Sequence, residues 1–122
     1  MSTKSTAEKL LIKPGATVWS SDPSRLALVD PLPDGARAQG GPVDADVALM
    51  WADDAASLRA VLDAHDDAAL HGPGAFWVLY PKGGRTDINR DSLWPILSER
   101  RMRPVSQVAV DETWSALRFR PA

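Results

Sequence analysis

The sequence predicts an α/β fold, a small three-layer αβα sandwich whose sheet is mostly parallel and ends in an antiparallel hairpin. Residues 46–51, from Val47 onward, and residues 75–80 are apolar at consecutive positions, as in strands that are buried on both faces of a parallel sheet. A helical pattern lies between these strands and another follows them, which is the alternation of a parallel sheet with right-handed crossovers. The last two strand patterns, residues 105–110 and 114–119, are joined by a link too short for a parallel return.

The N-terminal segment predicts a short helix. Residues 1–6 are polar and expected to be flexible, so the single domain is expected to span residues 7–122. Thr6 is a suitable cap for a helix over residues 7–12, which the Pro14-Gly15 pair would end.

The next segment contains the first strand and a long irregular region. Residues 16–20 predict the strand, and residues 21–43 are rich in proline and glycine. Only residues 24–30 of this region have a helical pattern, with Asp22 or Ser24 as the cap. The rest is expected to be loop, with room for one short strand.

The first long helix follows the strand at residues 46–51. Asp53 or Asp54 would cap it, and it is expected to reach about residue 70, before a glycine and a proline. The side chains expected on its inner face are Leu58, Val61, Leu62, His65 and Ala69.

The second long helix is expected from about residue 91 to residue 102. Pro95 would lie near its first turn, where a missing N–H is tolerated, and Pro104 would close it. Its expected inner edge is Leu93, Ile96, Leu97 and Arg100. The final strand alternates, with Ser115, Leu117 and Phe119 on one face and Trp114, Ala116, Arg118 and Arg120 on the other.

The composition limits the function classes. The formal net charge is -2, with 14 basic and 16 acidic residues, so a nucleic acid or an anionic membrane meets no general attraction. The chain has no cysteine, and with only His65 and His71 no metal site is expected. No apolar run is long enough to cross a bilayer and the N-terminus lacks the apolar core of a secretory signal, so we expect a cytoplasmic protein.

Four blocks of sequence carry a family resemblance. They are Lys13-Pro14-Gly15 and residues 46–51, 75–82 and 110–119, with residues 86–91 between the last two. In this order they resemble a bacterial family called domain of unknown function 3052 (DUF3052), over roughly residues 8–120 and least well at residues 22–43. The family has no assigned activity, so the resemblance implies no reaction.

The predicted topology is also similar to the C-terminal half of class I S-adenosylmethionine-dependent methyltransferases, a Rossmann-like fold whose last strand inserts antiparallel to its neighbours. Those enzymes hold the cofactor with a glycine-rich turn after the first strand and an acidic residue that ends the second. Here the first strand continues into Ser20-Ser21-Asp22-Pro23-Ser24, which contains no glycine. The resemblance therefore implies the scaffold, and no cofactor is expected.

The loop after the second buried strand is the first candidate for a ligand site, because ligands of open α/β sheets bind at the carboxyl ends of strands. Gly83 and Gly84 can adopt positive φ, so that successive N–H groups form an anion nest beside the charges of Lys82 and Arg85. The structural alternative is a solvated turn in which nearby carboxylates pair with these cations.

Neighbouring residues extend this candidate site. Asp87, Asn89 and Arg90 would orient a polar ligand, and Asp87 or Asn89 would equally serve as the cap of the next helix. Asp53 follows the first buried strand and would either contact a ligand in the same crevice or cap its own helix.

A second group of candidates lies on the hairpin. Asp111 would belong to a carboxylate pair with Glu112, or would simply favour the turn. Arg118 shares a strand face with Trp114 and would pack on its ring, or be exposed because the strand lies near the sheet edge. A Trp-rich edge strand would permit a homodimer as well as a monomer.

From these observations we expect a non-catalytic Rossmann-like binding or interaction module, with no catalytic residue assigned. Its partner would be a small anionic ligand or a protein. The alternatives are a small transferase, in the form of a degenerate S-adenosylmethionine-dependent methyltransferase, and a nucleic-acid-binding protein that uses Lys82, Arg85, Arg90 and the arginines at 100–103. The net charge of -2 argues against the last of these.

Overall fold

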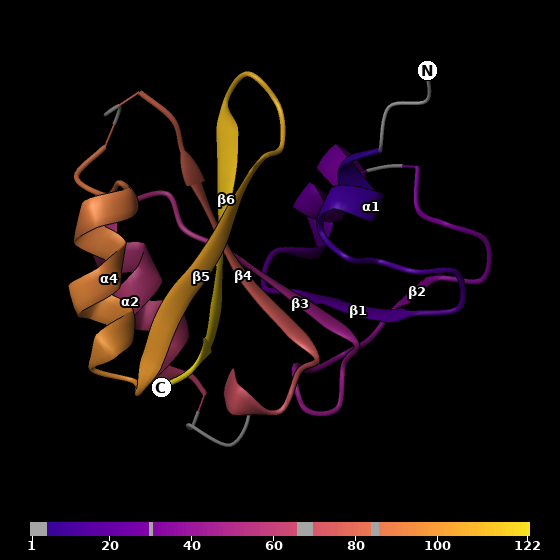
Figure 1. Cartoon of the computed structure of the whole chain (residues 1–122), viewed down its shortest axis with the longest axis horizontal. Coiled ribbons are helices and arrows are strands. Elements are labelled where there is room, and N and C mark those ends of the chain that lie inside the picture. Colours follow the sequence, from indigo (N-terminus) through magenta and orange to yellow (C-terminus); the bar gives the residue numbers. More distant parts are fainter. Residues whose placement is uncertain (1–4, 30, 66–69, 84–85) are drawn as a thin grey trace.

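The computed structural model describes residues 5–29, 31–65, 70–83 and 86–122. They form a six-stranded sheet in the order β2-β1-β3-β4-β6-β5 (Figure 1). The strands are β1 (Thr17–Ser20), β2 (Arg37–Ala38), β3 (Val47–Trp51), β4 (Ala75–Pro81), β5 (Met102–Ala109) and β6 (Trp114–Pro121). β1 to β4 are parallel, and β6 pairs antiparallel with both β4 and β5. The predicted mostly parallel sheet with an antiparallel hairpin is confirmed.

The two apolar strands form the centre of the sheet. β3 and β4 are parallel neighbours in a register that pairs Val47 with Ala75 and Trp51 with Leu79. Every residue of both strands is buried. Because each face of the sheet contributes to its own apolar core, these strands show no alternation of polar and apolar residues.

β6 lies one strand in from the edge, so its expected position near the edge is confirmed, whereas the expectation of a Trp-rich edge strand is wrong. It is inserted between β4 and β5, so that its first four residues, Trp114 to Leu117, are all buried. The edge strand is β5, whose side chains are mostly exposed and which contains no tryptophan. The argument for a homodimer from a Trp-rich edge strand therefore has no basis.

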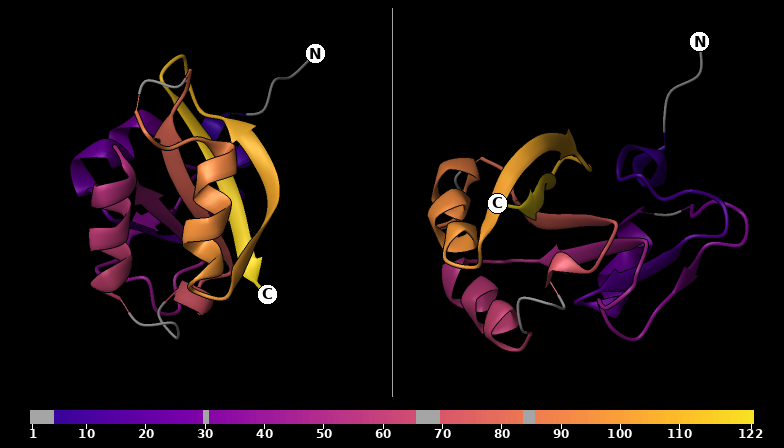
Figure 2. Two further views of the ribbon diagram at one scale, coloured as in Figure 1. Left: turned by 90° about the vertical axis from the view of Figure 1, so that its left-hand side faces the viewer. Right: turned by 60° about the horizontal axis from the view of Figure 1, so that its bottom comes forward.

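α2 (Ala55–Asp63) and α4 (Arg90–Ser98) cover one face of the sheet, as Figure 1 and Figure 2 show. Their buried side chains join one apolar cluster with the strand residues of that face. The helical members of this cluster are Leu58, Leu62, Leu93, Ile96 and Leu97. Both helices are shorter than the sequence predicts.

α2 ends at Asp63, and the prediction of one helix to residue 70 is wrong. His65 lies outside the helix and packs edge-on against Trp19, with ring centroids 5.1 Å apart. Ala69, predicted on the inner face, lies outside the described residues.

α4 ends at Ser98, and the prediction of a helix to residue 102 closed by Pro104 is wrong. Arg101 has a φ of 61°, a left-handed conformation that stops a helix, and β5 begins at the next residue. Pro104 lies within β5, where an edge strand tolerates a proline. Pro95 lies inside α4 rather than in its first turn.

α1 (Thr6–Lys9) and the 3-10 helix η1 (Pro23–Val29) pack on the opposite face, which completes the three predicted layers (Figure 2). Ser5, and not the predicted Thr6, caps α1, since its hydroxyl accepts from Glu8 N and the Glu8 carboxylate accepts from Ser5 N. Asp22 caps η1 by accepting from the backbone N of Ser24 at 3.1 Å. Among the described helices none is long and apolar enough to cross a membrane.

Candidate functional site

The carboxyl ends of β3 and β4 bring two predicted loops together. Ala52 N donates to Leu79 O at 2.9 Å, which continues the pairing of the two strands past Trp51. Asp87, in the loop after β4, accepts from Ala55 N at 2.8 Å through Oδ1. The loops that contain Asp53 and Lys82 therefore leave the sheet at the same end, as the parallel strands predict. We call this end, where β3 and β4 finish, the carboxyl edge of the sheet, as distinct from the lateral edge strand β5.

A pocket of about 540 Å³ lies at this edge, and we call it the Lys82 pocket. Its lining residues come from the end of β4, the start of α4, and the facing parts of β5 and β6. They are Tyr80, Lys82, Gly83, Asn89, Arg90, Gln107, Ala109 and Ser115. Four predicted site residues are therefore brought together here, whereas Gly84 and Arg85 lie outside the described residues.

The predicted anion nest is only partly present. Gly83 has the expected positive φ, at 76°. Lys82 N, however, donates to Thr113 O at 2.8 Å, so this N–H is not available to an anion. Between the described residues no ion pair involves Lys82 or Arg90, so both side chains can still neutralise a bound negative charge.

The wall of the pocket is a hydrogen-bonded group that the sequence analysis missed. Gln107 Nε2 donates to the Tyr80 hydroxyl oxygen at 2.9 Å and to Ser115 Oγ at 3.2 Å. Ser115 Oγ in turn donates to Val108 O at 3.3 Å. The sequence showed Gln107 and Ser115 as polar residues in the two strands of the predicted hairpin. Only the register across β4, β6 and β5 places them beside Tyr80.

Asp87 and Asn89 serve as structural partners of helix ends. Asn89 Oδ1 accepts from Asp91 N at 2.9 Å and from Ser92 N at 3.0 Å, and therefore caps α4. Asp87 accepts instead from the first residue of α2. The capping alternative is thus confirmed for Asn89, and Asp87 joins the β4–α4 loop to a different helix.

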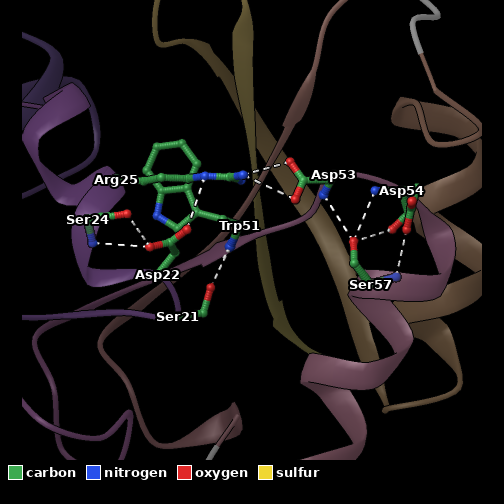
Figure 3. Close-up of polar contacts among 8 residues, drawn as sticks. All are labelled: Ser21, Asp22, Ser24, Arg25, Trp51, Asp53, Asp54 and Ser57. Carbon is green, nitrogen blue, oxygen red and sulfur yellow. Dashed lines mark hydrogen bonds and ion pairs between the residues drawn. The ribbon is translucent and has the colours of Figure 1, made fainter.

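At the same edge the strand order reverses between β1 and β3, and the segments that follow these two strands are joined by an ion pair. We call this region, which contains Asp22, Arg25 and Asp53, the switch-point crevice. Arg25 crosses it, with Nε 3.2 Å from Asp22 Oδ2 and Nη2 2.9 Å from Asp53 Oδ1 (Figure 3). Asp53 therefore binds Arg25 rather than lining the Lys82 pocket, and Asp54 caps α2.

Aromatic rings form the floor under Arg25. Its guanidinium carbon lies 5.0 Å from the ring centroid of Trp114. Trp51 packs edge-on against Trp114, at 5.0 Å between centroids and an interplanar angle of 88°. The cation over Trp114 is thus Arg25, and the predicted pair of Trp114 with Arg118 is wrong, because β6 places Arg118 at the other end of the sheet.

The acidic side of the crevice is held in its charged form. The Ser24 hydroxyl donates to Asp22 Oδ1 at 2.6 Å, and this hydrogen bond, with a smaller contribution from the Arg25 charge, lowers the pKa of Asp22. Ser21 Oγ accepts from Trp51 N at 2.8 Å, which ties the end of β1 to the end of β3. All these contacts are drawn in Figure 3.

The remaining two predicted residues have separate positions. Asp111 Oδ1 accepts from Thr113 N and Trp114 N, both at 2.7 Å, which is the turn role and not a carboxylate pair. Arg118 is only partly exposed, and its Nε is buried without a hydrogen-bond partner. It lines a different pocket, at the opposite edge of the sheet from Lys82.

No family model and no curated protein matches the sequence, so the resemblance to DUF3052 stays a prediction. Solved structures are similar in fold. A protein of the NADB-Rossmann superfamily from Streptococcus agalactiae is 9% identical, with a TM-score of 0.58 over 99% of this chain and 69% of that one.

Two methyltransferases are similar to the same degree. The 1,6-didemethyltoxoflavin-N1-methyltransferase of Burkholderia thailandensis, solved with S-adenosylhomocysteine, is 15% identical, with a TM-score of 0.57 over 95% of this chain and 76% of that one. A tRNA methyltransferase of B. subtilis is 11% identical, with a TM-score of 0.55 over 100% of this chain and 67% of that one. At these identities the likeness concerns the fold, which is therefore Rossmann-like and methyltransferase-like.

Proposed function

We propose that this chain is a degenerate methyltransferase-like protein that binds a small anionic ligand in the Lys82 pocket. By degenerate we mean that the protein keeps the fold and a ligand site at the carboxyl edge, while its switch-point crevice is closed by its own side chains. The single observation that supports this most is the Arg25 bridge between Asp22 and Asp53.

The Lys82 pocket has the charge and size for such a ligand. Its volume of about 540 Å³ lies in the usual range for small-molecule sites. Lys82 and Arg90 supply positive charge, and no acidic residue is among its described lining residues. Tyr80, Gln107 and Ser115 add polar atoms that are held in place by hydrogen bonds to one another and to β5. The pocket therefore attracts an anion and can orient it.

S-adenosylmethionine is the cofactor that the fold implies, and the switch-point crevice does not fit it. Ser21, Asp22 and Pro23 follow β1 where a close approach of the backbone to a cofactor would require glycine. β2 is followed by Gln39 rather than by an acidic residue, and its amide donates to Gly41 O at 2.8 Å. Arg25 occupies the remaining space with its two carboxylate partners. We assign no methyl-transfer step to this crevice.

A catalytic methyltransferase is the second candidate, and the fold comparisons are the observation that favours it. One similar structure contains S-adenosylhomocysteine, and this chain aligns with it over 95% of its length. For this candidate Arg25 would have to leave the crevice. The side chains of Arg25, Asp22 and Asp53 are 28%, 40% and 56% exposed, and ion pairs at such exposure cost only about 0 to 1 kcal/mol to break.

Calorimetric titration separates the two candidates. Inorganic pyrophosphate and S-adenosylhomocysteine are titrated separately into the wild-type protein, Arg25→Ala and the double variant Lys82→Ala/Arg90→Ala. We expect pyrophosphate to bind the wild type with a Kd on the order of 1 mM or below. Loss of two charge-assisted contacts should weaken this binding in the double variant at least about tenfold, and Arg25→Ala should leave it unchanged.

The matched control is Arg37→Ala/Arg103→Ala, which removes the same charge from exposed positions outside the pocket. If pyrophosphate binding weakened equally in this control, net charge alone would explain the effect, which would contradict binding in the Lys82 pocket. Binding of S-adenosylhomocysteine to the wild type would contradict a closed crevice and establish the second candidate instead.

A further inference from the structure

A second pocket lies at the opposite edge of the sheet, where β1, β3 and β4 begin. It has a volume of about 440 Å³, and we call it the Arg118 pocket. Ala16, Asp46 and Ala75, at the starts of the three parallel strands, form its base, and Leu11, Lys13 and Pro14 form one wall. Arg118 reaches this edge because β6 runs antiparallel to the others.

Arg118 has a buried donor for which the described part of the chain offers no acceptor. Its Nε is shielded from solvent and has no hydrogen-bond partner. A buried, unsatisfied N–H typically costs about 1 to 3 kcal/mol, and more on a charged group, so native proteins rarely leave one. A ligand cannot reach this shielded N–H as the protein stands, but Arg118 is partly exposed and lines the pocket, so an oxyanion there would meet the charge of its guanidinium.

The surroundings hold Arg118 in this position. On β6 it lies opposite Trp77 of β4 and Ser106 of β5, and β5 has a register irregularity at this point, between Pro104 and Ser106. Trp77 Nε1 donates to Leu10 O at 3.0 Å, which fixes the segment that forms the pocket wall. Side chains on central strands are more precisely held than those on loops.

The charges of the pocket select the type of anion. Lys13 and Arg118 are cationic, and Asp46 is the only acidic residue among the described lining residues. Asp46 Oδ2 accepts from Thr17 N at 2.9 Å, so this carboxylate is held in place by β1 and cannot move away from a ligand. A net charge of about +1 and one fixed carboxylate favour a monoanion over a dianion.

The rest of the lining is apolar, with Leu11, Pro14, Ala16 and Ala75 around the charged groups. Gly74 lets the strands come close, since a Cβ there would lie 2.9 Å from Asp46 O. We propose that the Arg118 pocket binds a small organic carboxylate, with the carboxylate accepting from the Arg118 guanidinium and the apolar part of the ligand against Leu11 and Pro14.

The Nε–H signal of Arg118 in a nitrogen-15 NMR spectrum of the whole protein tests the proposal directly. Sodium benzoate is titrated at constant ionic strength, and sodium phosphate in a parallel series. We expect benzoate to move the Arg118 signal in a saturable way, with half-saturation on the order of 1 mM. Phosphate at neutral pH should move it several-fold less, because part of it is a dianion facing Asp46.

Two variants extend the test without touching the core. Lys13→Gln, at an exposed position of the wall, should raise the half-saturating benzoate concentration several-fold. Arg120→Gln, an exposed cation on the same strand outside the pocket, is the matched control and should leave it unchanged. A signal that does not move with benzoate overturns the proposal, as does equal movement with sodium chloride. A response to phosphate as strong as that to benzoate overturns the choice of a carboxylate.

This inference is independent of the proposed function. The Arg118 pocket and the Lys82 pocket share no lining residue and lie at opposite edges of the sheet. Failure of pyrophosphate to bind would therefore leave the benzoate result unaffected, and the reverse also holds.

Discussion

The switch-point crevice and the Lys82 pocket lie at the same edge of one sheet, and their charges are arranged in opposite ways. In the crevice the cation Arg25 has two carboxylate partners and an indole beneath it. In the pocket Lys82 and Arg90 form no ion pair within the described part of the chain.

The difference shows how one scaffold can close one site and keep another. Ligands of open α/β sheets normally bind at the switch point, so the crevice is where the fold alone would place one. The one cation there, Arg25, is already paired with two carboxylates, so the region offers no free positive charge to an anionic ligand. At this edge Lys82 and Arg90 form no ion pair with another described residue, and the ligand site that we propose lies on their side of β4.

The largest expected effect concerns the floor of the crevice. Trp114→Ala removes a buried indole that contacts both Trp51 and Arg25, and we expect the free energy of unfolding to fall by about 3 to 5 kcal/mol. Urea denaturation measures this change. Trp94→Ala is the control, because Trp94 is 58% exposed and its removal should change stability by no more than about 0.5 kcal/mol. If the free energy of unfolding fell by similar amounts in the two variants, Trp114 would not be part of the apolar core beneath Arg25.

A smaller effect is expected for the bridge itself. Arg25→Met removes two partly exposed ion pairs and the contact with Trp114, which together should lower the free energy of unfolding by about 1 kcal/mol. Arg59→Met is the comparison, since Arg59 forms one exposed pair, with Glu99, at 3.1 Å. The free energy of unfolding of Arg59→Met should therefore be close to that of the wild type. If Arg25→Met were as neutral as Arg59→Met, the bridge would contribute nothing to closing the crevice.

The smallest effect is a change in titration. Ser24→Ala removes the hydroxyl that donates to Asp22, so the pKa of Asp22 should rise toward its ordinary value. A carboxylate with a lowered pKa in the folded state stabilises the protein above its unfolded pKa, about 3.9, and loses this contribution as the pH falls through the folded pKa. The effect is therefore confined to acid conditions below about pH 4. Carbon-13 NMR of the Asp22 carboxyl measures it, and an unchanged pKa in Ser24→Ala would show that the Arg25 charge dominates instead.

Predictions of the fold from the sequence succeeded where burial determines the pattern and failed where a helix ends. β3 and β4 were predictable because two buried faces require apolar residues at every position. The ends of α2 and α4 were not: α2 stops at Asp63, and α4 at Ser98, shortly before the left-handed residue Arg101. Neither end is visible in local spacing.

The candidate site was predictable only in part, for the same reason. Lys82, Gly83, Asn89 and Arg90 follow one strand and begin one helix, so their proximity is local in the sequence. Gln107 and Ser115 belong to the far hairpin and reach the pocket through strand pairing. Arg25 could not be assigned to Asp53 without knowledge of the distance between β1 and β3.

The sequence by itself determined the α/β class, the parallel central pair and the antiparallel hairpin, because these follow from hydrophobic spacing and from a short link. Only the tertiary structure decided that Arg25 pairs with both Asp22 and Asp53, that Gln107 and Ser115 meet Tyr80, and that Arg118 lines a pocket at the far edge of the sheet. These features depend on contacts between residues far apart in the chain. Periodicity records which face of an element is buried, but not which partner lies against it.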